Sequence, residues 1–146
     1  MQMTKLAPIR RAARKDIPAM ARIVWDWEQE TDWMPAGPTQ SRIAELLADA
    51  FENREIWVSG TPARGYLSLD PETDKIGGLY VSERRCGIGK SLIDQVKHGR
   101  NTIHLYTHLP NTDAHRFYDR EGFAIMEELL PEEQGMPREY RMEWRA

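Results

Sequence analysis

The first part of the chain has apolar residues at the spacing of two amphipathic helices. In the first stretch they are Ile17, Met20, Val24 and Trp27, and in the second Ile43, Leu46, Leu47, Ala50 and Phe51. Residues three or four apart share one face of a helix, so each stretch predicts a helix whose apolar face packs on a core. The first helix follows Asp16 and runs to about Glu30, and the second follows Thr39; both preceding residue types are common helix caps.

Before the first helix and after the second, the pattern of apolar residues is typical of strands. A first strand is expected at Lys5–Ala13, before the helices. Apolar runs at 56–58 and 65–69 flank a turn at 60–62, which predicts a hairpin. A further turn at 70–74 leads to a third antiparallel strand over 75–81. Gly77 and Gly78 lie inside that strand and predict a bulge or a close approach of another backbone.

The second half of the chain alternates turns, helices and strands. A turn over 82–89 precedes a predicted helix over Lys90–Lys97 and a strand over Thr102–His108. A helix over Asn111–Arg120, stopped by Gly122, then precedes two strands at Phe123–Leu130 and Arg138–Trp144. No repeat or linker interrupts this order. It predicts a single domain over residues 1–146 of the α+β, mixed α/β class, with helices on the faces of a sheet.

Composition narrows the classes of function. The 146 residues are 40% hydrophobic and 29% charged, which suits one globular domain and excludes two catalytic domains. Twenty Lys and Arg against 23 Asp and Glu give a net charge of −3, so we expect neither nucleic acid nor an anionic membrane as a partner. No apolar run approaches 18 residues, so no helix should span a bilayer.

Cysteine and histidine usage also limits the chemistry. Cys86 is the only cysteine, which predicts no disulfide framework and suits a reducing compartment, the cytoplasm. The four histidines show no paired ligand spacing on one helix, so we expect no metal site.

The most informative segment is the turn Arg84-Arg85-Cys86-Gly87-Ile88-Gly89-Lys90-Ser91. Its glycines allow successive backbone N–H groups to point inward, and the following helix start adds unpaired donors, which together favour an anion. A P-loop requires a glycine where Arg84 stands, and a dinucleotide fingerprint requires a third glycine where Leu92 stands. Both of these phosphate-binding patterns therefore fail.

Two segments resemble the GNAT superfamily of N-acetyltransferases. Arg84-x-x-Gly87-x-Gly89 is similar to the family's pyrophosphate loop, and the run from Asn111 to Phe123 is similar to its N-x-x-A-x-x-F-Y-x-x-x-G-F motif. The resemblance implies a GNAT-like, mostly antiparallel central sheet of about six or seven strands with about four helices on its faces. The strand before the loop lies about two residues closer to the glycines than in most relatives, so the loop is shortened.

The resemblance further implies that acetyl-CoA is the co-substrate and that no metal takes part. The residues it assigns to acetyl-CoA binding are Leu79, Tyr80, Val81, Arg84, Arg85, Cys86, Gly87, Ile88, Gly89, Lys90, Ser91, Asn111, Ala114, Phe117 and Tyr118. Main-chain amides near Leu79 and Val81 are expected to face the thioester carbonyl. Cys86 is not expected to be a nucleophile, because it occupies a variable position beside the pyrophosphate.

In the family, an acceptor amine attacks acetyl-CoA directly in a ternary complex. The resemblance gives Tyr118 the task of returning a proton to the thiolate, and Asn111 either caps its helix or binds coenzyme or water. Many relatives carry a glutamate on the fourth strand, but residues 76–81 offer no carboxylate. His108, at the end of a strand, is therefore the candidate general base. Three acidic residues are the alternatives: Glu28, Glu30 and Asp32.

Acceptor choice in the family depends on the first two helices and their connection. This region of the sequence contains a mixed set of aromatic, apolar and acidic residues: Trp25, Trp27, Trp33, Met34, Glu28, Glu30 and Asp32. Such a set could hold an aliphatic amine or the basic end of a peptide. Packing of the tryptophans in the core is the alternative explanation for most of them. The chain is expected to act on a primary amine of a small molecule, peptide or protein, as a monomer or homodimer. The alternative is a noncatalytic acyl-CoA-binding module; a phosphotransferase is disfavoured by the failed P-loop.

Overall fold

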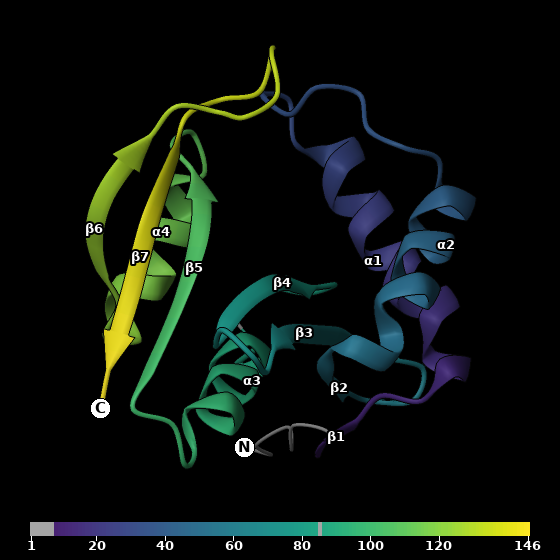
Figure 1. Ribbon diagram of the computed structural model, residues 1–146. Helices are drawn as coiled ribbons and strands as arrows, with labels where there is room; N and C mark the ends of the chain where they lie inside the picture. Colours follow the sequence, from purple (N-terminus) through teal and green to yellow (C-terminus); the bar gives the residue numbers. More distant parts are fainter. Residues whose placement is uncertain (1–7, 85) are drawn as a thin grey trace, which may run out of the picture.

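A seven-stranded sheet with helices on both faces forms the described part of the molecule, residues 8–84 and 86–146 of a computed structural model (Figure 1). The strands are β1 (Ile9–Arg11), β2 (Glu55–Ser59), β3 (Gly65–Asp70), β4 (Lys75–Val81), β5 (Thr102–His108), β6 (Ala124–Leu129) and β7 (Glu139–Arg145). The helices are α1 (Ile17–Glu30), α2 (Gln40–Ala50), α3 (Ile88–Lys97) and α4 (Thr112–Arg120), with short 3-10 turns at Arg14–Asp16 and Phe51–Asn53.

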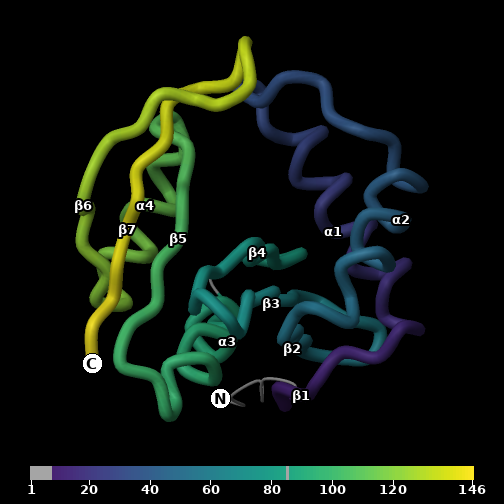
Figure 2. Tube along the Cα trace, in the orientation of Figure 1, coloured from purple at the N-terminus to yellow at the C-terminus, as the bar shows by residue number. Residues whose placement is uncertain are grey.

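The sheet order is β1-β2-β3-β4-β5-β7-β6, and among these strands only β4 and β5 pair in parallel. This confirms the expected α+β class and the mostly antiparallel sheet. The trace in Figure 2 follows the N-terminal strands and helices into β4 and α3, and then into the second unit formed by β5, α4, β6 and β7.

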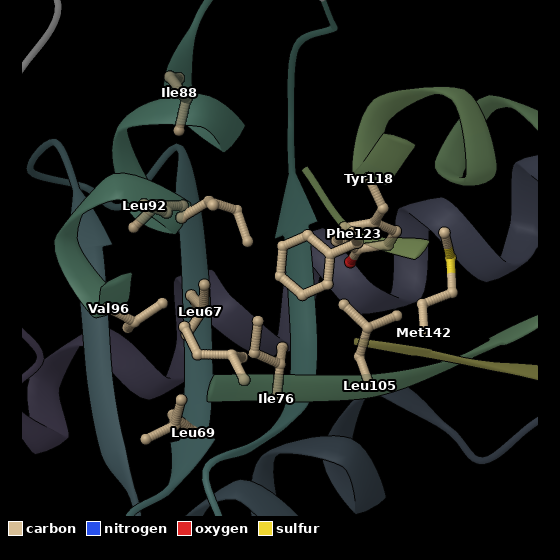
Figure 3. Packing of buried hydrophobic residues seen from close by; sticks show 12 residues of the cluster. Leu67, Leu69, Ile76, Ile88, Leu92, Val96, Leu105, Tyr118, Phe123 and Met142 are labelled. Atoms are coloured by element: carbon tan, nitrogen blue, oxygen red, sulfur yellow. The ribbon is translucent and has the colours of Figure 1, made fainter. Parts of the chain in front are cut away.

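Two apolar cores lie on opposite faces of the sheet. Successive side chains of a strand point to opposite faces, and on β3 Leu67 and Leu69 join one core whereas Tyr66 joins the other. The first core packs α3 and α4 against the sheet, with Leu92, Tyr118 and Phe123 directed to a common centre (Figure 3). The second core packs α1 and α2 against β2 and β3. The two helix pairs therefore cover different faces.

Strands β4 and β5 pair at only one end. Their parallel ladder joins Lys75 to His104 and Ile76 to Leu105, and in the described residues it continues no further. Beyond it the two strands diverge in Figure 1. Gly77 has no partner in the β3–β4 register, because Ser68 pairs with Gly78 and Leu69 with Ile76, so the bulge predicted from the glycines is confirmed. The divergence leaves one edge of β4 without a neighbouring strand.

Helix boundaries follow the sequence pattern closely, with one wrong assignment of a cap. Thr39 caps α2 as predicted, since the backbone N–H of Arg42 donates to its hydroxyl at 3.1 Å. Asp16 precedes α1, but its side chain makes no capping hydrogen bond there. Instead it accepts bonds from the Arg10 guanidinium at 2.7 and 2.8 Å and from the backbone N–H of Ala13.

Other differences lie at the ends of elements. The described part of the first strand is only Ile9–Arg11, and residues 5–7 of the prediction lie outside the described residues. Helix α3 begins at Ile88 rather than Lys90, since Gly87 with a φ of 81° forms its N-cap. Leu46 was expected on the buried face of α2 but is 46% exposed, because α2 packs mainly through Ile43. No helix within the described ranges has the length and apolar character needed to cross a bilayer.

Candidate active site

A cleft of about 730 Å³ opens where β4 and β5 separate. Its walls come from residues 76–81 of β4, the turn into α3, the end of β5 and α4, and Trp27 and Met34 also line it. A cleft in this place follows from the short β4–β5 ladder, because no strand fills the gap beyond Ile76. We call it the central cleft.

Most residues that the sequence assigned to coenzyme binding line this cleft. They are Leu79, Tyr80, Val81, Arg84, Cys86, Gly87, Ile88, Gly89, Lys90, Asn111, Ala114, Phe117 and Tyr118. Ser91, half-buried in the first turn of α3, does not line it, and Arg85 lies outside the described residues. The structure therefore gathers two distant sequence segments around one space.

The glycine turn presents a helix start to the cleft. The first N–H groups of a helix have no partner within it, and Gly87 has no side chain with which to cap those of α3. These donors lie beside the cleft, at the place where the sequence predicts that an anion binds. Gly89 has a second role: a Cβ at this position would lie 3.1 Å from Cζ of Phe117, so glycine lets α3 pack closely on α4.

Charged side chains cross the rim of the cleft near this turn. The Arg84 guanidinium on the turn lies 2.9 Å from Oδ2 of Asp113 on α4, and Arg116 contacts the other oxygen of the same carboxylate. Lys90 pairs with Glu121 at 3.3 Å and with Asp94 at 3.5 Å. Hydrogen bonding to Glu121 and the charges of both carboxylates raise the pKa of Lys90. The cations beside the turn are thus already paired with carboxylates.

Tyr118 is buried where α4 faces the cleft. Its ring makes edge contacts with Phe117 and Phe123, with centroids 5.2 and 5.5 Å away. Burial raises the pKa of its phenol well above the usual value, and the nearby Tyr80 adds to this shift. The phenol therefore keeps its proton at neutral pH. Asn111 accepts a hydrogen bond from the backbone N–H of Ala114 at 3.3 Å, which confirms its role as the cap of α4.

Aromatic residues form the other end of the cleft. Trp27 on α1 contacts Tyr80 on β4 and Trp33 on the α1–α2 connection, with ring centroids 5.6 and 5.8 Å apart. Trp33 in turn contacts the ring of His108 at 5.5 Å. Trp27, Met34, Tyr80 and His108 line the cleft, and Trp33 packs against two of them. We call these five residues the acceptor end, because the family resemblance predicts acceptor binding near the first two helices. Trp25 does not belong to it and packs on the core beneath α1.

Two polar atoms at this end are buried and have no hydrogen-bond partner among the described residues, Nδ1 of His108 and Oε2 of Glu28. A buried polar atom without a partner is uncommon and calls for a ligand or water in the working protein. Burial raises the pKa of Glu28, and both burial and the charge of Glu28 raise the pKa of Tyr80, to about 12. Glu30 and Asp32 are exposed.

Several residues of the site were not predicted. Asp113 and Arg116 occupy variable positions of the second motif, and only their opposite charges three residues apart on a helix could have drawn attention to them. Thr107 of β5 also lines the cleft. Cys86 is half-buried there and donates its thiol hydrogen to the carbonyl of Glu83. Within the described ranges, no three His, Cys, Asp or Glu side chains gather as a metal site would require.

Comparison with known proteins agrees with this geometry. Residues 52–125 match the family model of the acetyltransferase (GNAT) domain. A curated relative, the peptidyl-lysine N-acetyltransferase YiaC of Escherichia coli, is 28% identical over 138 residues, which cover 88% of this chain and 91% of that protein.

Solved structures share the whole fold. A GCN5-related N-acetyltransferase from Rhodopseudomonas palustris superimposes with a TM-score of 0.76 at 18% identity, over 100% of this chain and 99% of the other. YncA of Salmonella typhimurium, a putative acetyltransferase solved with acetyl-CoA, has a TM-score of 0.69 at 16% identity, over 94% and 92% of the two chains. The family match spans half of this chain and includes the glycine turn and the α4 motif, and the chain therefore belongs to the GNAT acetyltransferases, which transfer acetyl groups from acetyl-CoA.

Proposed function

We propose that the protein is an N-acetyltransferase in which a primary amine attacks acetyl-CoA directly within a ternary complex. The observation that carries this proposal is the central cleft itself, which joins the glycine turn at one end to the aromatic acceptor end at the other. A thioester donor and an amine can therefore enter from different sides and meet between β4 and β5. Such an arrangement needs no covalent acyl-enzyme.

The donor end fits the phosphates and the pantetheine arm of acetyl-CoA. The amides at the start of α3 and the guanidinium of Arg84 supply donors for the diphosphate. The unpaired edge of β4 near Leu79 and Val81 supplies main-chain groups to the arm and to the thioester carbonyl. A donor placed there stabilises the negative charge that develops on the carbonyl oxygen during attack.

Two protons have to move in the reaction. An alkylamine of the lysine type has a pKa of about 10.4, so its deprotonation at pH 7 costs roughly 4 to 5 kcal/mol. We assign this step to His108, whose free Nδ1 lies at the acceptor end, directly or through a water molecule. The leaving thiolate takes a proton from Tyr118, which lines the cleft and is protonated at neutral pH.

The acceptor end favours a positively charged alkylamine. The rings of Trp27 and Trp33 offer aromatic faces, which attract cations, and Met34 offers an apolar surface for an aliphatic stem. Within the described residues, no Lys or Arg forms an ion pair with Glu28, so its negative charge near Tyr80 is not neutralised. These features support a lysine side chain as the acceptor, the group on which the relative from Escherichia coli acts by its name.

One observation favours a second function, that of a noncatalytic acyl-CoA-binding module. The described part of β4 carries no carboxylate, so the base common in many relatives is missing, and a noncatalytic acyl-CoA-binding module would look the same at the donor end. The two functions differ in turnover. The test is to titrate the protein with acetyl-CoA, ATP and NAD, and then to follow thiol release with a panel of amines. Binding of acetyl-CoA with amine-dependent thiol release supports the enzyme, whereas binding without release supports the module.

A preference for ATP or NAD over acetyl-CoA contradicts both functions. That outcome would also make the glycine turn a nucleotide site rather than an acyl-CoA site. The comparison of the three ligands therefore comes before any assay of turnover.

A further inference from the structure

Two guanidinium groups from different elements converge on one carboxylate at the rim of the central cleft. Arg84 belongs to the turn between β4 and α3, and Arg116 lies on the facing helix α4. Both contact Asp113, Arg84 through Oδ2 at 2.9 Å and Arg116 through Oδ1. All three residues line the cleft. The two cations therefore reach the two oxygens of one carboxylate.

A phosphate group has the chemistry to replace that carboxylate. Phosphate oxygens accept hydrogen bonds from guanidinium groups in the same two-point geometry as carboxylates do, and they carry more negative charge. The neighbouring donors point to the same ligand, because the start of α3 opens on the cleft beside Arg84. The position that Asp113 fills is thus an anion position built from two walls.

The existing ion pairs are weak enough to be exchanged. The side chains of Arg84, Asp113 and Arg116 are 72%, 60% and 66% exposed, and ion pairs in such exposed positions contribute little to stability. Hydrogen bonds from Arg116 and Arg84 and the positive charges of both groups lower the pKa of the Asp113 carboxyl, so it is ionised at neutral pH. Once a phosphate has entered, the Asp113 charge beside it repels it. Asp113 therefore competes with the ligand for both cations.

We propose that Arg84 and Arg116 form a phosphate clamp for acetyl-CoA, and that Asp113 occupies the clamp in the free protein and lowers coenzyme affinity. This inference rests on the proposed function for the identity of the ligand. It adds Arg116 and Asp113, which stand at unspecified positions of the second motif, to the groups that set coenzyme affinity. Asp113 acts on binding and has no part in proton transfer.

The experiment measures the dissociation constant for acetyl-CoA by calorimetry, with no acceptor present. Asp113→Asn keeps a hydrogen-bond acceptor but removes the charge, so binding should become about two- to fivefold tighter at low salt. Arg116→Gln should weaken binding by a similar factor. In the Arg116→Gln background, Asp113→Asn should have a smaller effect, because one of the two contested cations is gone. Asp119→Asn, an exposed charge change on the same helix, is the matched control.

Two further ligands locate the contact on the coenzyme. Dephospho-coenzyme A lacks the 3′-phosphate, and acetyl-pantetheine lacks every phosphate. If the effect of Asp113→Asn persists with dephospho-coenzyme A, the clamp holds the diphosphate, and if it vanishes, the clamp holds the 3′-phosphate; both results support the clamp. The effect must be absent with acetyl-pantetheine.

The clamp is overturned if Asp113→Asn leaves acetyl-CoA binding unchanged or weakens it, if the control Asp119→Asn tightens binding as much, or if acetyl-pantetheine shows the same gain. Failure of the proposed function has a different signature, since the unaltered protein would then not bind acetyl-CoA at all. Circular dichroism of each variant shows whether a change in affinity reflects loss of the fold.

Discussion

The ring of Trp33 meets the ring of His108 edge-on, with centroids 5.5 Å apart. This contact ties the connection between α1 and α2 to the end of β5. It buries Nδ1 of His108 at the acceptor end without giving it a hydrogen-bond partner in the described part of the chain. The imidazole is thereby held in place with one nitrogen free for a substrate or water.

Replacement of His108 tests the assignment of the base. We expect His108→Gln to lower the acetylation rate at saturating amine by about a hundredfold, because general bases contribute about 10² to 10⁴ in rate. Coenzyme affinity should stay the same, since the residue lies at the far end of the cleft from the glycine turn. The rate is followed by thiol release, with His98→Gln, an exposed histidine after α3, as the control. Full activity of His108→Gln would exclude it as the base.

Replacement of Tyr118 tests the proton donor. Tyr118→Phe preserves the ring that packs on Phe117 and Phe123, so the fold and coenzyme affinity should change little. The acetylation rate should fall strongly, by about a hundredfold, because the thiolate loses its proton source. Single-turnover thiol release and a coenzyme titration on the same preparation separate the two effects. Normal turnover in this variant would remove Tyr118 from the mechanism.

Replacement of Glu28 tests the acceptor class. Glu28→Gln removes a partly buried negative charge that acts on Tyr80, so KM for a lysine peptide or an alkylamine should rise about fivefold, in line with roughly 1 kcal/mol for the attraction between two opposite charges. KM for a weakly basic amine that is neutral at the assay pH should not change. Glu30→Gln, on the exposed end of the same helix, is the control. An equal rise for charged and neutral amines would show a structural effect instead.

Stability should depend on Asp16 in a pH-sensitive way. The hydrogen bonds from Arg10 lower the pKa of this buried carboxyl below its usual value in unfolded chains, about 3.9. A lowered folded-state pKa stabilises the fold above the unfolded value, and the gain is lost as pH falls through the folded value. Asp16→Asn should therefore cost about 2 kcal/mol at pH 7, and the difference from the unaltered protein should shrink below about pH 4.

Urea unfolding at both pH values measures this difference. Asp49→Asn, an exposed acidic residue on α2, is the matched control and should leave the free energy of unfolding nearly unchanged. A cost for Asp16→Asn that persists undiminished at low pH would contradict the role of its charge. A packing effect would then be the better account.

Local spacing in the sequence was enough to predict most elements. Helix α1 has the expected ends, and the glycine turn and the helix from Asn111 lie where their residues predicted. These features depend on neighbours within about four positions, whose periodicity and capping preferences act before any tertiary contact forms. The prediction failed for the Asp16 cap, because Arg10 competes for that carboxylate across a turn.

By itself, then, the sequence determined the class of fold, the position of the glycine turn and the family, since each depends on short motifs in a fixed order. The tertiary structure decided the separation of β4 from β5, the contact of Trp33 with His108 and the bridge from Arg84 to Asp113. Each of these joins residues far apart in the chain. Such pairs form only when strand register and helix packing bring distant segments together, and no local periodicity encodes that choice.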